Sequence, residues 1–145
     1  PNVNSYKRFA SESFAPTAVA WGTDNRTCGF RVVGHGQSRR MECRIPGADV
    51  NPYMALAALI ASGLDGIDRG LELEPPCEGN AYASDHPHVP RTLEAARERF
   101  ATSDVVRDAL GADVVDHYVN MADVELAAYR AAVTDWELRR GFERM

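Results

Sequence analysis

Apolar and polar residues alternate along three short stretches in the first third of the chain. A period of two is typical of half-buried β-strands. In the second stretch Cys28, Phe30 and Val32 share the side that faces the core, and Arg31 lies on the opposite side. We place the three predicted strands at residues 17–22, 27–33 and 39–46.

The third stretch has one apolar face, whereas its other face carries Arg40, Glu42 and Arg44. Two guanidinium groups that flank a carboxylate suit a phosphate or carboxylate ligand together with a divalent cation. A salt-bridged face exposed to solvent is the alternative interpretation of the same three residues.

Arg26 and Arg31 are separated by an odd number of positions, which places two side chains on opposite faces of a regular strand. For both to contact one ligand, Arg26 must belong to the turn at residues 23–25, or Gly29 must mark a bulge. The sequence leaves these two possibilities open.

The pattern becomes helical after Asn51, a good N-cap that is followed by Pro52 at the first helical position. Residues 53–67 are apolar almost all round, which predicts a helix buried behind the sheet. Residues 71–89 are rich in proline and acidic residues, and we expect an irregular segment there. Helices return after Pro90, with caps at Thr92 and Ser103 and a long helix from Asp113 past Trp136.

These patterns predict an α+β fold with about three antiparallel strands, a buried helix and a C-terminal helical layer. A chain of 145 residues with 45% hydrophobic residues can bury a single core. The net charge of -5 is uneven, because residues 1–55 hold seven basic and four acidic side chains. A basic front on an acidic chain suits a small anionic ligand, whereas a nucleic acid requires a continuous cationic face. Nucleic-acid binding is therefore disfavoured.

Cys28, Cys43 and Cys77 show no CxxC spacing, so we interpret them as reduced structural thiols of a cytoplasmic protein. The longest apolar run, at residues 53–64, is too short to cross a bilayer and no signal peptide precedes it. We expect no membrane association. Because the chain begins with Pro1 rather than methionine, we expect it to be a piece of a longer protein.

Several motifs follow one another in a fixed order along the chain. They are Asn4-Ser5-Tyr6-Lys7-Arg8, Ala15-Pro16, Trp21-Gly22-Thr23-Asp24-Asn25-Arg26, Arg31, Arg39 to Pro46, Asn51-Pro52-Tyr53 and Gly63-Leu64-Asp65-Gly66. Together they closely resemble the C-terminal part of the catalytic domain of glutamine synthetases. The resemblance implies that residues 1–145 are the C-terminal portion of such a domain, within a protein about three times longer that forms a large homo-oligomer.

The resemblance also implies a chemistry. The full protein would use ATP and Mg²⁺ or Mn²⁺ to convert glutamate into γ-glutamyl phosphate, which an amine attacks to give a γ-glutamyl amide. A family member that has lost catalysis and acts as a regulatory or binding protein is the alternative from another class. The implied roles are catalysis near the transferred phosphate for Arg26, substrate binding for Arg8 and Arg44, ATP binding for Arg31 and Arg40, and metal binding for Glu42.

Phe14 departs from the family pattern, because it stands where glutamine-forming members carry the flap glutamate that helps to deprotonate ammonium. A phenyl ring accepts no proton, but it can pack against an organic amine or a cationic polyamine. The sequence therefore favours an organic amine over ammonia as the acceptor, with Phe14 in the substrate site. The alternative is that Glu12 replaces the missing acid. Tyr82 lies where many bacterial members carry an adenylylated tyrosine, although its neighbours match poorly.

Overall fold

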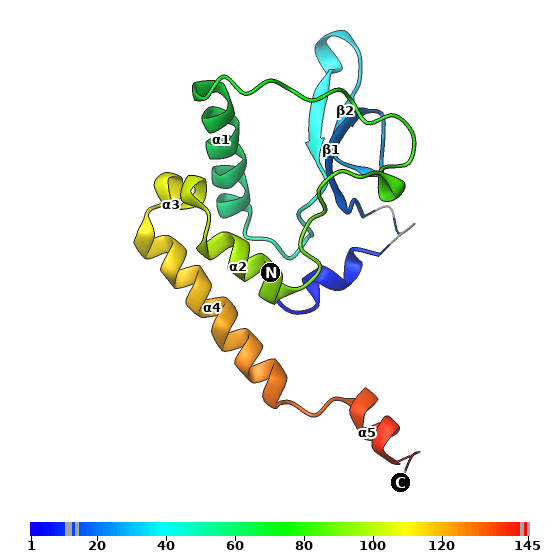
Figure 1. Ribbon diagram of the computed structural model, residues 1–145, viewed down its shortest axis with the longest axis vertical. Helices are drawn as coiled ribbons and strands as arrows, with labels where there is room; N and C mark the ends of the chain where they lie inside the picture. The colour runs from blue at the N-terminus through cyan, green and yellow to red at the C-terminus, as the bar shows by residue number, and fades with distance from the viewer. Residues whose placement is uncertain (11–12, 14, 143, 145) are drawn as a thin grey trace.

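The computed structural model describes residues 1–10, 13, 15–142 and 144. A small sheet occupies one side of the molecule and helices the other, and the chain ends in a helix that projects away from both (Figure 1). The predicted α+β class is therefore confirmed. The elements are η1 (Ser5–Arg8), β1 (Ala18–Thr23), β2 (Cys28–Val33), η2 (Gly36–Ser38), β3 (Arg40–Cys43), α1 (Pro52–Asp68), η3 (Ala81–Ala83), α2 (Leu93–Ala101), α3 (Asp104–Leu110), α4 (Ala112–Ala131) and α5 (Asp135–Phe142).

The sheet has the strand order β1-β2-β3. β2 and β3 are antiparallel as predicted, but β1 and β2 are parallel. Ala18 pairs with Cys28 at one end of β1, and Thr23 pairs with Val32 at the other. The short connection therefore doubles back along the sheet instead of forming a hairpin. It begins at Asp24, whose φ of 50° is a left-handed conformation that Asp tolerates better than most residues.

The outer edge of β1 is covered by the irregular segment that follows α1. Residues 74–79, which we call the strap, are attached by the Trp21 indole, which donates to the Glu74 carbonyl at 2.7 Å, and by the Cys77 amide, which donates to the Trp21 carbonyl at 2.8 Å. Further along, Val89 donates to the Thr17 carbonyl at 2.8 Å. A segment that we expected to be irregular thus seals the sheet edge.

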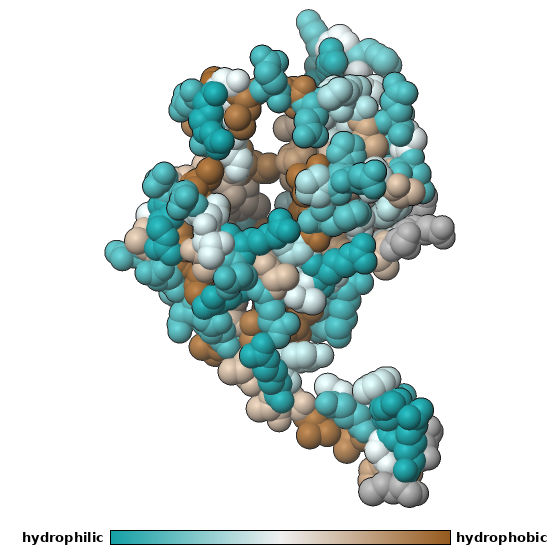
Figure 2. All heavy atoms as spheres, viewed as in Figure 1, coloured by the Kyte–Doolittle hydropathy of each residue, from teal (hydrophilic) through white to brown (hydrophobic). Residues whose placement is uncertain are grey.

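The helix α1 contradicts its predicted burial, because none of its residues is fully buried. Its side chains at positions 53, 56, 60, 64 and 67 form an exposed apolar stripe; Tyr53 is 83% and Ile67 75% exposed. In Figures 1 and 2 the helix stands beside the sheet rather than under it. Because α1 is apolar on all sides, the elements that neighbour it in this chain cover only part of its apolar surface.

The helical layer is built from α2, α3 and α4; α4 packs against both α2 and α3, and α3 also contacts α1. Thr92 and Ser103 cap α2 and α3 as predicted. The single long helix that we expected is divided into α4 and α5, because Thr134 and Glu137 form a capping box that starts a new helix. The Thr134 amide donates to a Glu137 carboxylate oxygen at 2.7 Å. No helix in the described part of the chain is both long and apolar enough to cross a membrane.

Candidate active site

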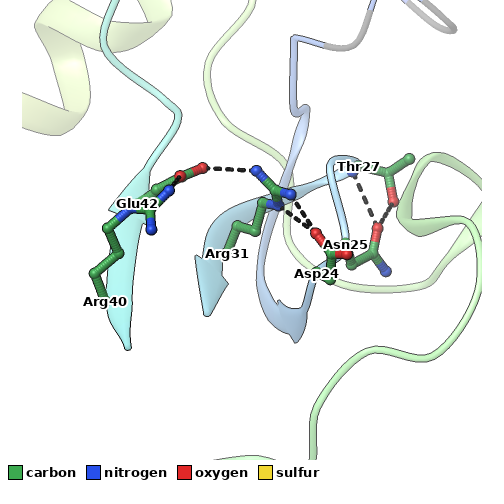
Figure 3. Close-up of polar contacts among 6 residues, drawn as sticks. All are labelled: Asp24, Asn25, Thr27, Arg31, Arg40 and Glu42. Carbon is green, nitrogen blue, oxygen red and sulfur yellow. Dashed lines mark hydrogen bonds and ion pairs between the residues drawn. The ribbon is translucent and has the colours of Figure 1, made fainter. Parts of the chain in front are cut away.

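Arg31 is the centre of a line of alternating charges on the solvent side of the sheet (Figure 3). On β2, Arg31 stands opposite Glu42 of β3, and its Nη1 lies 3.0 Å from Glu42 Oε2. Its Nε donates to Asp24 Oδ1 at 3.0 Å. The other oxygen of Glu42 accepts from Arg40 Nη2 at 3.0 Å. Of the three residues predicted to share this face, Arg40 and Glu42 do so, whereas Arg44 lies beyond the end of β3; Arg31 and Asp24 extend the face instead.

The charges in this line hold one another in their ionised forms. The hydrogen bond from Arg31 lowers the pKa of Asp24. The pKa of Glu42 is lowered mainly by its hydrogen bond from Arg31 and to a smaller extent by the one from Arg40. The bond to Asp24 in turn raises the pKa of Arg31. Only 13% of the Arg31 side chain is exposed, against 60% for Arg40. Arg31 is thus a fixed cation, and Arg40 keeps most of its surface available to a ligand.

Arg26 lies in the connection between β1 and β2, so the first of the two arrangements left open by the sequence is the one that occurs. Arg26 and Arg31 line one cavity of about 750 Å³, together with Thr23, Asp24, Asn25, Thr27 and residues 76–79. Arg26 is exposed and makes no hydrogen bond or ion pair with any residue that the structure describes. Its guanidinium donors therefore remain available to an anion in the cavity.

Asn25 fixes the shape of the connection and was not identified from the sequence. Its Oδ1 accepts hydrogen bonds from the Thr27 amide at 3.0 Å and from the Thr27 hydroxyl at 2.6 Å. Its Nδ2 donates to the carbonyl of Gly79 at 2.8 Å, so it also joins the connection to the strap. The Asp24-Asn25 pair is a turn signal, but its contact with residues distant in sequence had no local signal.

Arg8 and Arg44 form a second group. Arg8 ends η1 and donates to the backbone carbonyls of Ile45 at 2.5 Å and of Arg44 at 3.4 Å. β3 ends at Cys43, and the Arg44 amide continues the pairing by donating to the Gly29 carbonyl at 2.8 Å. Arg8 also lines an apolar cavity of about 430 Å³ between the sheet and α1. Phe14 and Glu12 lie outside the described residues.

The described residues do not by themselves fit a divalent metal. Glu42 is the only predicted metal ligand, and both of its oxygens are bound by arginines. No group of three or more His, Cys, Asp or Glu side chains within the described residues is arranged to hold a metal ion. Mg²⁺ and Mn²⁺ take about six oxygen ligands, so Glu42 would supply one position of a site that needs further residues.

Three comparisons with known proteins agree with this architecture. The family model described as "Glutamine synthetase, catalytic domain" matches residues 1–141. A γ-glutamylethanolamide synthetase from Streptomyces coelicolor is 63% identical over 145 residues, which are 100% of this chain and 31% of that protein. A solved structure titled "GmaS/ADP complex-Conformation 1" superposes with a TM-score of 0.83 at 28% identity, over 99% of this chain and 35% of that one.

More distant relatives include ligases for different amines. A glutamate–isopropylamine ligase from a Pseudomonas species is 41% identical over 97% of this chain and 31% of its own length. A glutamine synthetase from Thermus thermophilus is 39% identical over 97% of this chain and 33% of its own length. The chain thus spans about a third of the length of the curated relatives it matches. By its matched domain and its relatives, this chain belongs to the glutamine synthetase family.

Proposed function

We propose that this chain is the C-terminal portion of the catalytic domain of an ATP-dependent ligase. The whole protein would activate glutamate as γ-glutamyl phosphate and join it to an amine. The observation that carries the proposal is the cavity between the β1–β2 connection and the strap, which is lined both by Arg26, unpaired among the described residues, and by the fixed Arg31. Two cations at one cavity match the charge of a phosphoryl group in transfer.

The arginines differ in how firmly they are held, which suggests different roles. Arg31 is clamped between Asp24 and Glu42, so it would keep its position whether or not a phosphate is bound. Arg26 has no such partner among the described residues and would turn towards the charge that develops as the phosphoryl group leaves ATP. Arg40, exposed beside Glu42, would bind ATP phosphates from the open side.

Arg8 and Arg44 would bind the glutamate substrate. Arg44 directly follows β3, and the guanidinium of Arg8, from η1, is held there by the two backbone carbonyls that it binds. Mg²⁺ or Mn²⁺ would shield the charge of the nucleotide phosphates, with Glu42 as one oxygen ligand. The described residues form no complete metal site, so the roles given to the arginines do not depend on the ion. We further propose a cytoplasmic enzyme that assembles as a large homo-oligomer.

We propose a small organic amine as the acceptor. The relative that is 63% identical is named for ethanolamine as the acceptor, and another is named for isopropylamine. At the sequence level, Phe14 in place of an acidic residue supports the same choice, because ammonium needs an anionic group that binds and deprotonates it. Glutamine synthetases are also among the relatives, at lower identity, so ammonia is the competing acceptor.

The test is the kcat/KM of the full-length enzyme for ethanolamine, isopropylamine, putrescine, spermidine and ammonia, with ATP and glutamate saturating. We expect at least about a tenfold preference for an organic amine over ammonia. Phe14→Ala should lower kcat/KM for that amine, whereas the matched variant Glu12→Gln should leave it unchanged. A preference for ammonia that Glu12→Gln abolishes and Phe14→Ala leaves intact would overturn the choice of amine.

A further inference from the structure

Cys28 and Cys77 meet behind the wall of the candidate active site. Cys28 begins β2 and is completely buried, in a cluster with Ala18, Ala20 and Ala81. Cys77 belongs to the strap, is half-buried and packs against this cluster. The two residues are 49 positions apart in sequence, so their contact is a product of the fold rather than of local geometry.

Several hydrogen bonds fix the strap where Cys77 meets Cys28. The Cys77 amide donates to the Trp21 carbonyl at 2.8 Å, and the Cys77 carbonyl accepts from Asn25 Nδ2 at 3.2 Å. Between the two cysteines lies Gly22, where a Cβ atom would be 3.0 Å from the Cys77 carbonyl oxygen and 3.2 Å from the Cys28 sulfur. The absence of a side chain at Gly22 therefore permits the close approach.

The surroundings give the two sulfurs different reactivity. The pKa of the Cys28 thiol is raised to about 11, mainly by burial and secondarily by the neighbouring Cys77. Cys28 is consequently protonated at neutral pH and hidden from solvent. Cys77 is the sulfur that a small oxidant reaches, because it is only partly covered. A metal site is a poor alternative, since no third His, Cys, Asp or Glu within the described residues completes a ligand group there.

We propose that Cys28 and Cys77 form a reversible disulfide when the protein meets a peroxide. The Cys77 thiol gives up its proton, its sulfur forms a bond to one peroxide oxygen, and the O–O bond breaks. The product is a sulfenic acid, and the departing hydroxide takes up the proton from Cys77 to become one water. The Cys28 sulfur then attacks the Cys77 sulfur, the S–O bond breaks, and the hydroxide leaves as water with the proton from Cys28. Two thiols lose two electrons in total, and one peroxide becomes two waters.

The disulfide would act on the cavity that holds Arg26. Residues 76–79 form one wall of this cavity, and the opposite wall is the connection that follows β1. In the reduced chain the strap is attached by hydrogen bonds and by the packing of Cys77, with no covalent bond, so it can detach locally. A covalent bond from Cys77 to β2 would remove that freedom and fix the wall. This inference concerns the thiols and does not depend on which reaction the protein catalyses.

The experiment treats the full-length protein with hydrogen peroxide under native conditions, blocks free thiols and maps tryptic peptides by mass spectrometry. Cleavage after arginine separates Cys28, Cys43 and Cys77 into the peptides 27–31, 41–44 and 70–91. We expect 27–31 to be linked to 70–91, with dithiothreitol reversing the link. The yield at a fixed time should rise between about pH 7 and pH 9, because the attack on the sulfenic acid needs the Cys28 thiolate.

Two serine variants provide the controls. Cys77→Ser should abolish the linked peptide, whereas Cys43→Ser, which changes another half-buried cysteine, should leave its yield unchanged. The linked protein should unfold at a Tm about 5 °C or more above that of the reduced protein, and Cys77→Ser should lose this shift. Oxidation of Cys77 to the sulfinic acid without a link to Cys28, or links that involve Cys43 equally often, would overturn the proposal.

Discussion

Arg31 and Glu42 stand opposite each other on antiparallel strands, and their side chains are joined at 3.0 Å. Arg31 also binds Asp24, so a single guanidinium connects two carboxylates from different elements. Asp24 and Arg31 themselves line the cavity that holds Arg26. The line of charges therefore contributes both to the cohesion of the sheet and to the position of the candidate active site.

The first prediction concerns acid stability. The folded protein lowers the pKa of Asp24 from 3.8 and that of Glu42 from 4.5, so the unfolded chain binds more protons near these values. The stabilisation is complete above pH 4.5 and is lost as the pH falls through the lower folded values. We expect Tm to fall with pH in this window. The double variant Asp24→Asn, Glu42→Gln should show a flatter dependence.

Asp108→Asn is the matched control for this measurement, because Asp108 is exposed on α3 and forms no ion pair with the residues that the structure describes. The Tm of the Asp108→Asn variant should equal that of the wild type at every pH. Identical slopes for the wild type and the double variant would show that the two carboxylates do not contribute to the acid sensitivity.

The second prediction separates Arg26 from its neighbours. In the full-length enzyme Arg26→Ala should lower kcat by about 10² to 10³, because its charge would meet the transferred phosphoryl group mainly in the transition state. The KM values for ATP and glutamate should change by less than about threefold. Tm should stay the same, since Arg26 makes no hydrogen bond with the described residues.

Steady-state kinetics with varied ATP and glutamate check this prediction. Arg99→Ala removes an exposed arginine from α2 and should leave the kinetics unchanged. A rise in KM with constant kcat would assign Arg26 to ground-state binding instead.

The third prediction concerns Arg8, whose guanidinium is held by the carbonyls of Ile45 and Arg44. Arg8→Ala should raise the KM for glutamate by about 10 to 100-fold while kcat changes little, since the lost contact would be made equally in the ground state and the transition state. Tm should decrease because the variant loses two partly buried hydrogen bonds to the backbone. Lys7→Ala, the exposed neighbour, should alter neither quantity. A fall in kcat as large as that of Arg26→Ala would contradict the assignment.

The fourth prediction is that the 145-residue chain alone makes no γ-glutamyl amide from ATP, glutamate and an amine. Its one predicted metal ligand is Glu42, and the chain spans about a third of the relatives it matches. Mass spectrometry of the products checks this, with the full-length protein at equal concentration as the positive control. Product formed by the short chain, and lost on Arg26→Ala, would show that it contains a sufficient site.

The sequence predicted local features better than contacts between distant segments. Arg40 and Glu42 share a face because a strand alternates, and Asn51, Thr92 and Ser103 cap helices because their side chains accept backbone hydrogen bonds. The meeting of Arg26 and Arg31 stayed open because it depends on the conformation of the connection that Asn25 fixes. Asn25 does so partly through its contact with the strap, which is distant in sequence and has no local signal.

Three expectations about the fold were wrong for identifiable reasons. A connection as short as the one after Thr23 ordinarily joins antiparallel strands, yet here it doubles back to a parallel partner. The apolar surface of α1 implied neighbours on every side, and the described chain covers only part of it. The division at Thr134 did have a local signal, since Thr and Glu three positions apart form a capping box, but the apolar residues on either side of Thr134 continue at helical spacing and predict one helix.

The attachment of Trp21 to the strap gives the protein a built-in optical probe. The sequence has two tryptophans, of which Trp136 is 63% exposed on α5 and Trp21 is half-buried with its indole bound to the Glu74 carbonyl. In this chain, Trp136→Phe leaves Trp21 as the sole tryptophan. Its fluorescence would shift to longer wavelength whenever the strap lifts and water reaches the indole, so the movement of one wall of the cavity can be followed in real time.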